Sequence, residues 1–181
     1  MMETISPDSL SYPIGKFSFN SNADKKEIKQ WISEIEKFPI WIKEAVEELY
    51  EQQLNTPYRD GGWTIKQVVH HLADSHMNAY IRVKLALTED RPTIKPYDEK
   101  QWAEMDDAKN LPVEYSLSIL ESLHPRWVYV LKNISENDLE RVVFHPARGK
   151  EMSVKYIIAQ YAWHGKHHCA HITELRKRHN W

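Results

Sequence analysis

The chain has 181 residues, enough for one domain with a sizeable core. Its 24 Lys and Arg residues nearly balance 26 Asp and Glu residues, and the net charge of -2 excludes the strongly basic surface that nucleic acid binding requires. No stretch approaches the roughly 18 apolar residues of a membrane span, residues 1–4 do not resemble a signal peptide, and Cys169 is the only cysteine. We therefore expect a cytoplasmic protein that binds neither nucleic acid nor membrane.

The chain begins with residues 1–23, which are rich in Ser, Asn and Pro, and we expect them to form an extended arm ahead of a single helical domain over residues 24–181. From Lys25 to Leu54 apolar residues recur at intervals of three and four, which predicts an amphipathic helix. Pro39 lies inside this run and is expected to kink the helix rather than divide it.

A loop over residues 55–62 precedes the second long helix, which we predict from Thr64 to about Leu87. Thr64 and Gln67 have the spacing of a capping box, which marks a helix N-terminus. Two prolines within residues 91–96 prevent the helix from continuing beyond that point.

The second half of the chain is also helical in pattern. We expect a short helical segment over residues 98–107, a third long helix over residues 113–133 and a further helical turn after Ser135. Residues 145–150 form a predicted loop, and Ser153 is the predicted N-cap of the last helix. Four principal helices without a period-two segment predict an all-α four-helix bundle, and the long loops predict at least one crossover connection.

The last helix contains four histidines within residues 164–171. At about 100° per residue, His168 lies in the middle of the apolar face and His164 at its edge, whereas His167 and His171 are rotated about a quarter turn away. Two buried neighbouring imidazoles need partners for their ring nitrogens, since an unsatisfied buried polar group costs about 1 to 3 kcal/mol. A shared metal ion would satisfy both His164 and His168.

A second histidine cluster lies on the predicted helix that begins at Thr64. It consists of His70, His71 and His76, and periodicity alone places His76 on the apolar face with His70 and His71 on its flanks. An isolated pair of histidines four apart is more often explained by ordinary hydrogen bonds than by a metal. The presence of two clusters shifts our interpretation to a metal site, without deciding which upstream histidine takes part.

The two clusters and their flanking residues also resemble a known family. Segment 63–74 (Trp-Thr-Ile-Lys-Gln-Val-Val-His-His-Leu-Ala-Asp), followed by the pattern Trp163-His164-x3-His168-x2-His171, resembles the DinB/YfiT-like superfamily and its YfiT-like branch of metal-dependent hydrolases. The similarity covers nearly the whole chain, including residues 10–15 and 56–62. It implies a four-helix bundle, a homodimer and one divalent metal ion per subunit. The ligands it implies are His71, His164 and His168, with His71 in place of His76.

Three neutral imidazoles leave a metal ion with an open position, which is typical of catalytic rather than structural zinc. We expect zinc, with nickel or manganese as alternatives, to lower the pKa of bound water to near 7 or to deprotonate a thiol. Gly165 follows His164 where a metalloprotease of the H-E-x-x-H type has its glutamate base, so protease chemistry is disfavoured.

A bound thiolate needs no such base, and this favours thiol transfer over hydrolysis. The resemblance allows either reaction, since it implies a superfamily that includes enzymes joining low-molecular-weight thiols such as bacillithiol or mycothiol to electrophiles, alongside members named only as hydrolases. We therefore predict a metal-dependent hydrolase or thiol S-transferase. The alternative is a non-catalytic, metal-stabilised stress-response or binding module, and a nuclease is disfavoured by the charge balance and the lack of clustered carboxylates.

Other residues have weaker claims to a role. Asp74 could orient a ligand imidazole but is more often a surface aspartate, and Cys169 is expected to be a small core residue. Four further histidines could line the pocket or pair with carboxylates, and three arginines could bind an anionic substrate group or simply lie on the surface: His70, His76, His167 and His171, and Arg59, Arg82 and Arg126.

Overall fold

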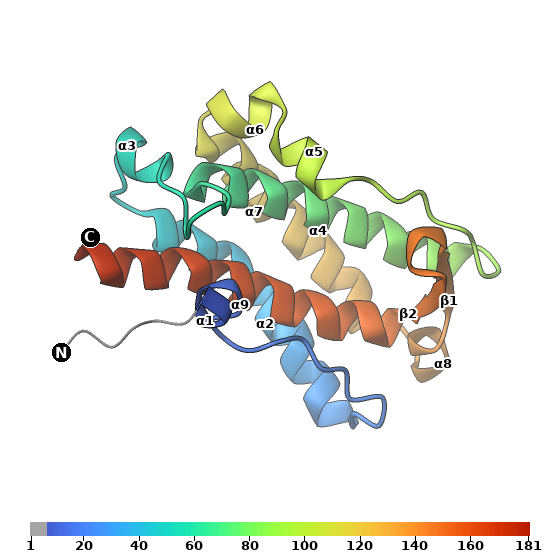
Figure 1. Ribbon diagram of the computed structural model, residues 1–181. Coiled ribbons are helices and arrows are strands. Elements are labelled where there is room, and N and C mark those ends of the chain that lie inside the picture. The colour runs from blue at the N-terminus through green and yellow to red at the C-terminus, as the bar shows by residue number, and fades with distance from the viewer. Residues whose placement is uncertain (1–6) are drawn as a thin grey trace.

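The computed structural model describes residues 7–181 and places the long helices of these residues side by side in a bundle (Figure 1). This confirms the predicted all-α four-helix bundle. The bundle helices are α2 (Lys25–Val46), α4 (Ile65–Thr88), α7 (Val113–Lys132) and α9 (Val154–His179).

Shorter elements connect the bundle helices. Helix α1 precedes the bundle, α3 lies between α2 and α4, α5 and α6 lie between α4 and α7, and α8 and a small β hairpin lie between α7 and α9 (Figure 1). Their bounds are α1 Pro7–Ser11, α3 Glu51–Leu54, α5 Glu99–Ala103, α6 Asp106–Asn110, α8 Glu136–Leu139, β1 Val142–His145, the 3-10 helix η1 Pro146–Arg148 and β2 Lys150–Ser153.

The order of the helices around the bundle differs from the order along the chain. Helix α2 packs against α7 and α9, and α4 packs against the same two helices. Consecutive long helices α2 and α4 are therefore diagonal to each other, and so are α7 and α9. The connections between them cross the bundle, as the long loops predicted.

Side-chain caps start the helices where the sequence predicted them. The Thr64 hydroxyl accepts a hydrogen bond from the Gln67 backbone N–H, and the Gln67 side chain accepts one from Thr64 in return. Ser153 caps α9 by accepting from the Tyr156 N–H. These bonds satisfy backbone donors that the first helical turn leaves free.

The first long helix ends earlier than predicted. The chain remains helical through Pro39 but leaves the helix after Val46, and Glu48 has a left-handed φ of 62°. Arg176 of α9 donates hydrogen bonds to the carbonyls of Ala45 and Glu47. This cap comes from a distant helix, so the local pattern that continued to Leu54 could not show it.

Residues 142–153 form an antiparallel hairpin rather than a simple loop. Val142 pairs with Ser153 and His145 with Lys150, and Gly149 takes the left-handed φ of 61° that the tight connection needs. Each strand has only four residues, too few for a period-two pattern to stand out. Residues 98–107, which we predicted as one short helical segment, contain α5 and the start of a second short helix, α6.

The N-terminal arm packs along α9. Residues 1–6 of the predicted arm lie outside the described residues, and α1 makes the following part helical rather than extended. Tyr12 contacts the ring of His167, and Phe17 and Phe19 contact Tyr156. The arm therefore covers one side of α9.

Helix α4 is buried on most of its circumference. His70, His71 and His76 all have exposed fractions of 8% or less, although they project in different directions. Helices α5 and α6 cover the side that α7 and α9 leave open. The cover on these sides of α4 therefore comes from the same chain. None of the helices in residues 7–181 is long and apolar enough to cross a membrane.

Candidate metal centre

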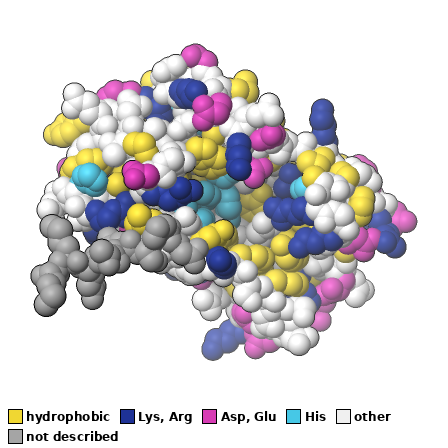
Figure 2. All heavy atoms as spheres, in the orientation of Figure 1, with side chains coloured by type: hydrophobic (Ala, Val, Ile, Leu, Met, Phe, Trp, Pro, Cys, Tyr) yellow, Lys and Arg dark blue, Asp and Glu magenta, His cyan; other side chains and the backbone are white. Residues whose placement is uncertain are grey.

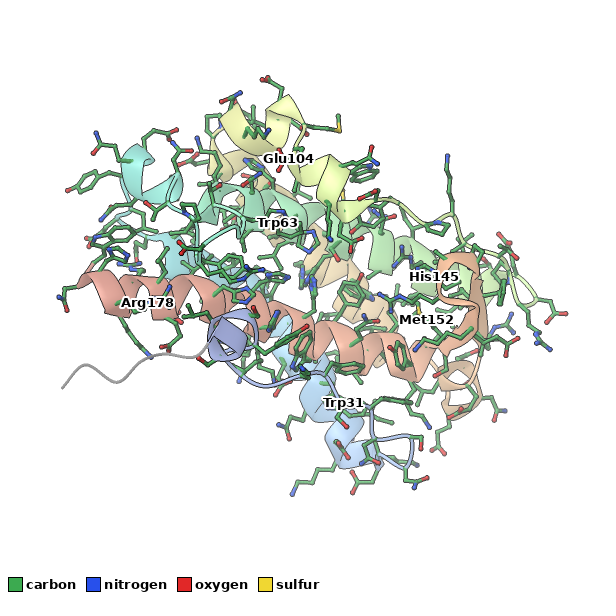
Figure 3. All side chains as sticks on the ribbon, in the orientation of Figure 1. Trp31, Trp63, Glu104, His145, Met152 and Arg178 are labelled. Carbon is green, nitrogen blue, oxygen red and sulfur yellow. The ribbon has the colours of Figure 1, made fainter. Side chains whose placement is uncertain are left out.

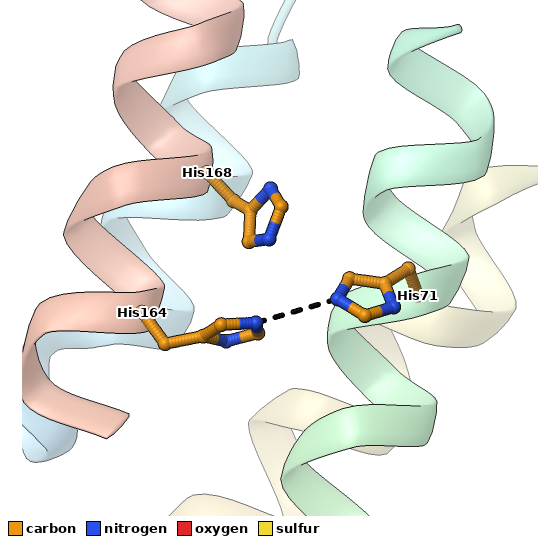
Figure 4. Close-up of side chains that lie close together, drawn as sticks. All are labelled: His71, His164 and His168. Carbon is orange, nitrogen blue, oxygen red and sulfur yellow. Dashed lines mark hydrogen bonds between the residues drawn. The ribbon is translucent and has the colours of Figure 1, made fainter. Parts of the chain in front are cut away.

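Three histidines from two helices meet inside the bundle. His71 on α4 faces His164 and His168 on α9, and one ligand nitrogen from each lies within 4.8 Å of the others (Figure 4). The Nε2 atoms of His71 and His164 are 3.3 Å apart. His164 and His168 are four residues apart, so α9 presents both from one side.

The three histidines line a cavity of about 590 Å³ that opens to the surface. Its wall also includes Trp63, Tyr97 and Tyr161, and Figure 2 shows histidine atoms within a hollow on this face. A ligand in the cavity can therefore reach the histidines directly.

A chain of hydrogen bonds, here called the first relay, fixes the tautomer of His164. The Ile35 carbonyl can only accept, so the His124 Nδ1–H donates to it at 2.7 Å. His124 Nε2 then accepts from the Nδ1–H of His76 at 2.9 Å, and His76 Nε2 accepts from the Nδ1–H of His164 at 3.3 Å. The remaining nitrogen, His164 Nε2, is left with a free lone pair facing His71.

A second relay has the same effect on His168. The Ser11 carbonyl accepts from the Nε2–H of His171 at 3.2 Å, and His171 Nδ1 accepts from the Nδ1–H of His168 at 3.3 Å. His168 therefore keeps a lone pair on Nε2. Both ring nitrogens of His171 are already used, although His167, His168 and His171 form a second group close enough for a metal ion.

The tautomers follow from these anchors because the rings are neutral. Burial lowers the pKa of His71, His124 and His171 to about 4. Burial, followed by the neighbouring histidines, lowers the pKa of His164 and His168 well below the ordinary value. At neutral pH the site offers uncharged imidazoles, which is the form that binds metal.

The separation between His71 and His164 fits two ligands of one tetrahedral ion. Two nitrogens each about 2.05 Å from a tetrahedral zinc lie about 3.3 Å apart, and this matches the separation of the His71 and His164 Nε2 atoms, 3.3 Å. Without a metal, two facing lone pairs on the Nε2 atoms of His71 and His164 would repel each other. Because the first relay leaves a lone pair on His164 Nε2, the Nε2 atom of His71 carries a proton, which an ion would displace. The donor set suits zinc, nickel, copper or iron.

Gly165 shows why no glutamate follows His164. A Cβ placed on Gly165 would lie 2.6 Å from Cδ2 of Phe38, whose ring stacks on His76 at 4.6 Å. This position faces α2 and not the cavity. A glutamate here would be driven into the core and could not act as a base on the metal side.

The other predicted site residues are placed differently. Within residues 7–181, no hydrogen bond joins the carboxylate of Asp74 to a histidine, and burial, then the charge of Asp107, raises its pKa to about 6. His167 lines the cavity, stacks on Trp163 at 4.3 Å and has a buried Nδ1 without a partner in that part of the chain. Cys169 is buried in the core, as predicted.

Sequence reasoning missed His124, which connects the first relay to the Ile35 carbonyl. The side chain is 1% exposed and lies between Leu120 and Trp127 on the inward face of α7. The sequence did contain a signal for it: His124 follows Leu120 by four residues and precedes Trp127 by three, which is the spacing of residues on the apolar face of a helix. Ser11 gave no signal, because its backbone carbonyl and not its side chain anchors the second relay.

Comparison with known proteins places this geometry in a family context. Residues 42–172 match the DinB superfamily. A protein of Oceanobacillus iheyensis is 56% identical over 170 residues, which cover 94% of this chain and 98% of the relative. A Bacillus cereus protein is 55% identical over 172 residues, or 95% of this chain and 98% of the relative. Both relatives bear the name "putative metal-dependent hydrolase".

A solved structure has the same fold. YfiT from Bacillus subtilis superimposes with a TM-score of 0.93 at 47% identity, covering 96% of this chain and 99% of that chain. It is described as a "probable metal-dependent hydrolase with an unusual four-helix bundle topology". The diagonal connections of this chain are consistent with that description.

Proposed function

The chain belongs to the DinB superfamily, and from this premise we propose that it is a metal-dependent enzyme that activates a small nucleophile for attack on an electrophile. We propose His71, His164 and His168 as the ligands of one divalent ion per subunit, with zinc as the first candidate. The names of the relatives support metal-dependent hydrolysis as the general class. As the specific reaction, we propose transfer of a low-molecular-weight thiol in preference to hydrolysis.

The observation that supports this proposal most strongly is the arrangement of lone pairs at the cavity wall. Both relays leave Nε2 of the α9 histidines free, and His71 faces them from α4. An ion held there would supply Lewis acidity that lowers the pKa of a thiol or of water at its open position.

Two of the remaining wall residues can orient a ligand through hydrogen bonds. The Ser75 hydroxyl and the Tyr161 phenol are hydrogen bonded at 3.1 Å, and burial raises the pKa of Tyr161, so the phenol remains a donor at neutral pH. Among residues 7–181, Glu99 is the only carboxylate in the cavity wall. A thiol loses its proton without a dedicated base, and this is why we favour it over water.

An activity assay with matched variants tests the proposal. Zinc-, nickel- and manganese-loaded protein is incubated with a small thiol and a haloaromatic electrophile, and in parallel with a panel of esters and amides. We expect thiol consumption that disappears in His164→Ala and persists in His179→Ala, which changes an exposed histidine of the same helix. Ester or amide turnover without thiol transfer would assign water as the nucleophile, and no turnover in either panel would refute the enzyme proposal.

The second candidate is a non-catalytic module in which the ion contributes folding energy. The two buried relays support this candidate, because they connect the proposed ligands to the backbone of α2 and of the N-terminal arm. Thermal unfolding of His164→Ala separates the candidates. A large loss of stability with no activity in the wild type supports the module, whereas a small change with loss of activity supports the enzyme.

We retain the homodimer as part of the proposal, on the family resemblance. Light scattering of the metal-loaded protein tests it, and a monomeric mass across the working concentration range would exclude it.

A further inference from the structure

One end of the cavity, away from the three histidines, contains a buried arginine without an acidic partner. Arg82 of α4 lines the cavity and is 8% exposed. Within residues 7–181 its guanidinium makes no ion pair with a carboxylate, and it lies over the ring of Tyr97, with 6.0 Å from the guanidinium carbon to the ring centroid. Buried charges are almost always paired, because removing an unpaired ion from water is costly.

Two groups on the β hairpin lie in the same wall. His145 is 7% exposed, and its buried Nδ1 has no hydrogen-bond partner in the part of the chain that the structure describes. Arg148 lies three residues further on, in η1. Burial, followed by the positive charges of Arg148 and Arg82, lowers the pKa of His145, so its ring is neutral at pH 7. Figure 3 shows His145 on the hairpin, near the start of α9.

The charge of this wall indicates the charge of its ligand. Arg82 and Arg148 contribute two positive charges and Glu99 one negative charge, while His145 is neutral at pH 7, so the wall has a net charge of about +1. An anionic group such as a carboxylate would offset part of this positive charge. The planar fork of a guanidinium pairs with a carboxylate through two parallel hydrogen bonds.

The position of Arg82 along α4 sets the length of such a ligand. Arg82 follows His71 by eleven residues, about three helical turns, so the two lie on the same side of the helix roughly 16 Å apart along its axis. Long side chains on a helix lean toward its N-terminus, which brings the guanidinium back toward the histidines. A ligand several bonds long can therefore span both ends of the cavity.

We propose that Arg82, together with His145 and Arg148, binds a carboxylate of the substrate whose reactive end lies at His71, His164 and His168. The proposal rests on the proposed function for the identity of that reactive end. It adds a substrate class, because the thiol or the electrophile bears a carboxylate several bonds from its reacting atom.

Matched thiols test the proposal through a spectroscopic readout. Cobalt-loaded protein is titrated with mercaptocarboxylates from mercaptopropionate to mercaptohexanoate and with mercaptoalcohols of equal length, and binding is followed by the sulfur-to-cobalt charge-transfer band. A charged hydrogen bond to Arg82 predicts roughly 10- to 100-fold tighter binding of the best carboxylate over its alcohol. Haloaromatic electrophiles with and without a carboxylate are compared by KM, to identify which reactant bears the anion.

Variants locate the effect. Arg82→Gln should abolish the preference, and Arg82→Lys should retain part of it, because the charge remains while the fork is lost. Arg126→Gln is the matched control, since Arg126 is an exposed arginine of α7 that lies near Tyr80 and outside the cavity wall. This control should retain the full preference. Equal affinities within both the thiol pair and the electrophile pair would overturn the carboxylate site.

A second titration separates failure of this site from failure of the proposed function. If no thiol produces a charge-transfer band, the thiol proposal fails, and glutarate is then titrated into the metal-free protein by calorimetry. Glutarate binding that is lost in Arg82→Gln supports the carboxylate site independently of thiol chemistry. Absence of glutarate binding to the wild type would overturn it.

Discussion

Replacing His124 by Phe tests whether the first relay prepares His164 for a metal. The substitution keeps an aromatic ring in a site that is 1% exposed, beside Phe38 and Trp127. It removes the acceptor of the His76 Nδ1–H and the donor to the Ile35 carbonyl. The chain would then keep its packing and lose the anchor of the relay.

The expected magnitudes follow from these contacts. Each unpaired buried group costs about 1 to 3 kcal/mol of folding free energy, so the metal-free variant should be less stable by about 2 to 6 kcal/mol. In the variant, His76 can also adopt the tautomer that is protonated on Nε2 and donate a hydrogen bond to Nδ1 of His164. His164 must then be protonated on Nε2, which is the nitrogen that faces His71. Loss of such outer contacts typically weakens metal binding 10- to 100-fold, or about 1.4 to 2.8 kcal/mol.

Competition with a chromophoric zinc chelator measures the affinity, and long-range proton–nitrogen NMR identifies the protonated ring nitrogen of His164. His70→Phe is the matched control. It removes a buried α4 histidine that bonds to Ser116 at 2.7 Å and to the Leu111 carbonyl at 3.0 Å, outside both relays. This control should be destabilised with unchanged zinc affinity. Equal zinc affinity in the two variants would refute the relay.

Three further predictions concern stability and reactivity. The pKa of His124 is lowered to about 4 in the folded protein, below the value of about 6.5 in the unfolded chain. The contribution of His124 to the stability of the metal-free protein is therefore complete above pH 6.5 and falls by up to about 1.4 kcal/mol per pH unit between pH 6.5 and 4, because the unfolded chain binds the proton. The urea midpoint should be lower at about pH 5 than at about pH 7.5, and equal midpoints would contradict the assignment. Gly165→Ala should lower the urea midpoint, since overpacking against Phe38 costs about 1 to 3 kcal/mol and exceeds the helix-propensity gain of about 1 kcal/mol. Adding Phe38→Leu to this variant should recover part of the lost stability. A Gly165→Ala variant as stable as the wild type would show that α2 and α9 can separate to make room for the methyl group. Burial raises the pKa of Cys169 to about 12, so iodoacetamide should modify it slowly at neutral pH and Cys169→Ala should bind as much metal as the wild type; rapid labelling or loss of metal would assign it to the site.

The sequence predicted the long helices because their signals are local. Apolar intervals of three and four, and caps such as Thr64 and Ser153, depend only on neighbouring residues. The end of α2 at Val46 depends on Arg176, about 130 residues away, and was predicted wrongly. The hairpin was missed because strands of four residues have too little periodicity.

The candidate ligands show a similar division. Helical rotation selected His164 and His168 from the four histidines of α9, but on α4 it favoured His76 over His71. The structure buries both α4 residues, and they take different positions: His71 faces the cavity, and His76 bonds to His164 from within the core. A hydrophobic pattern indicates burial but not which side of a buried helix faces a cavity. The prediction of His71 instead of His76 as a ligand therefore depended on the family resemblance.

Anomalous diffraction from a crystal of the zinc-loaded protein tests the central claim most directly. We predict one zinc ion per subunit, bonded to Nε2 of His71, His164 and His168 at about 2.0 to 2.1 Å, with an open position toward the cavity. An ion bound instead among His167, His168 and His171, or coordination of the α9 histidines through Nδ1, would contradict it.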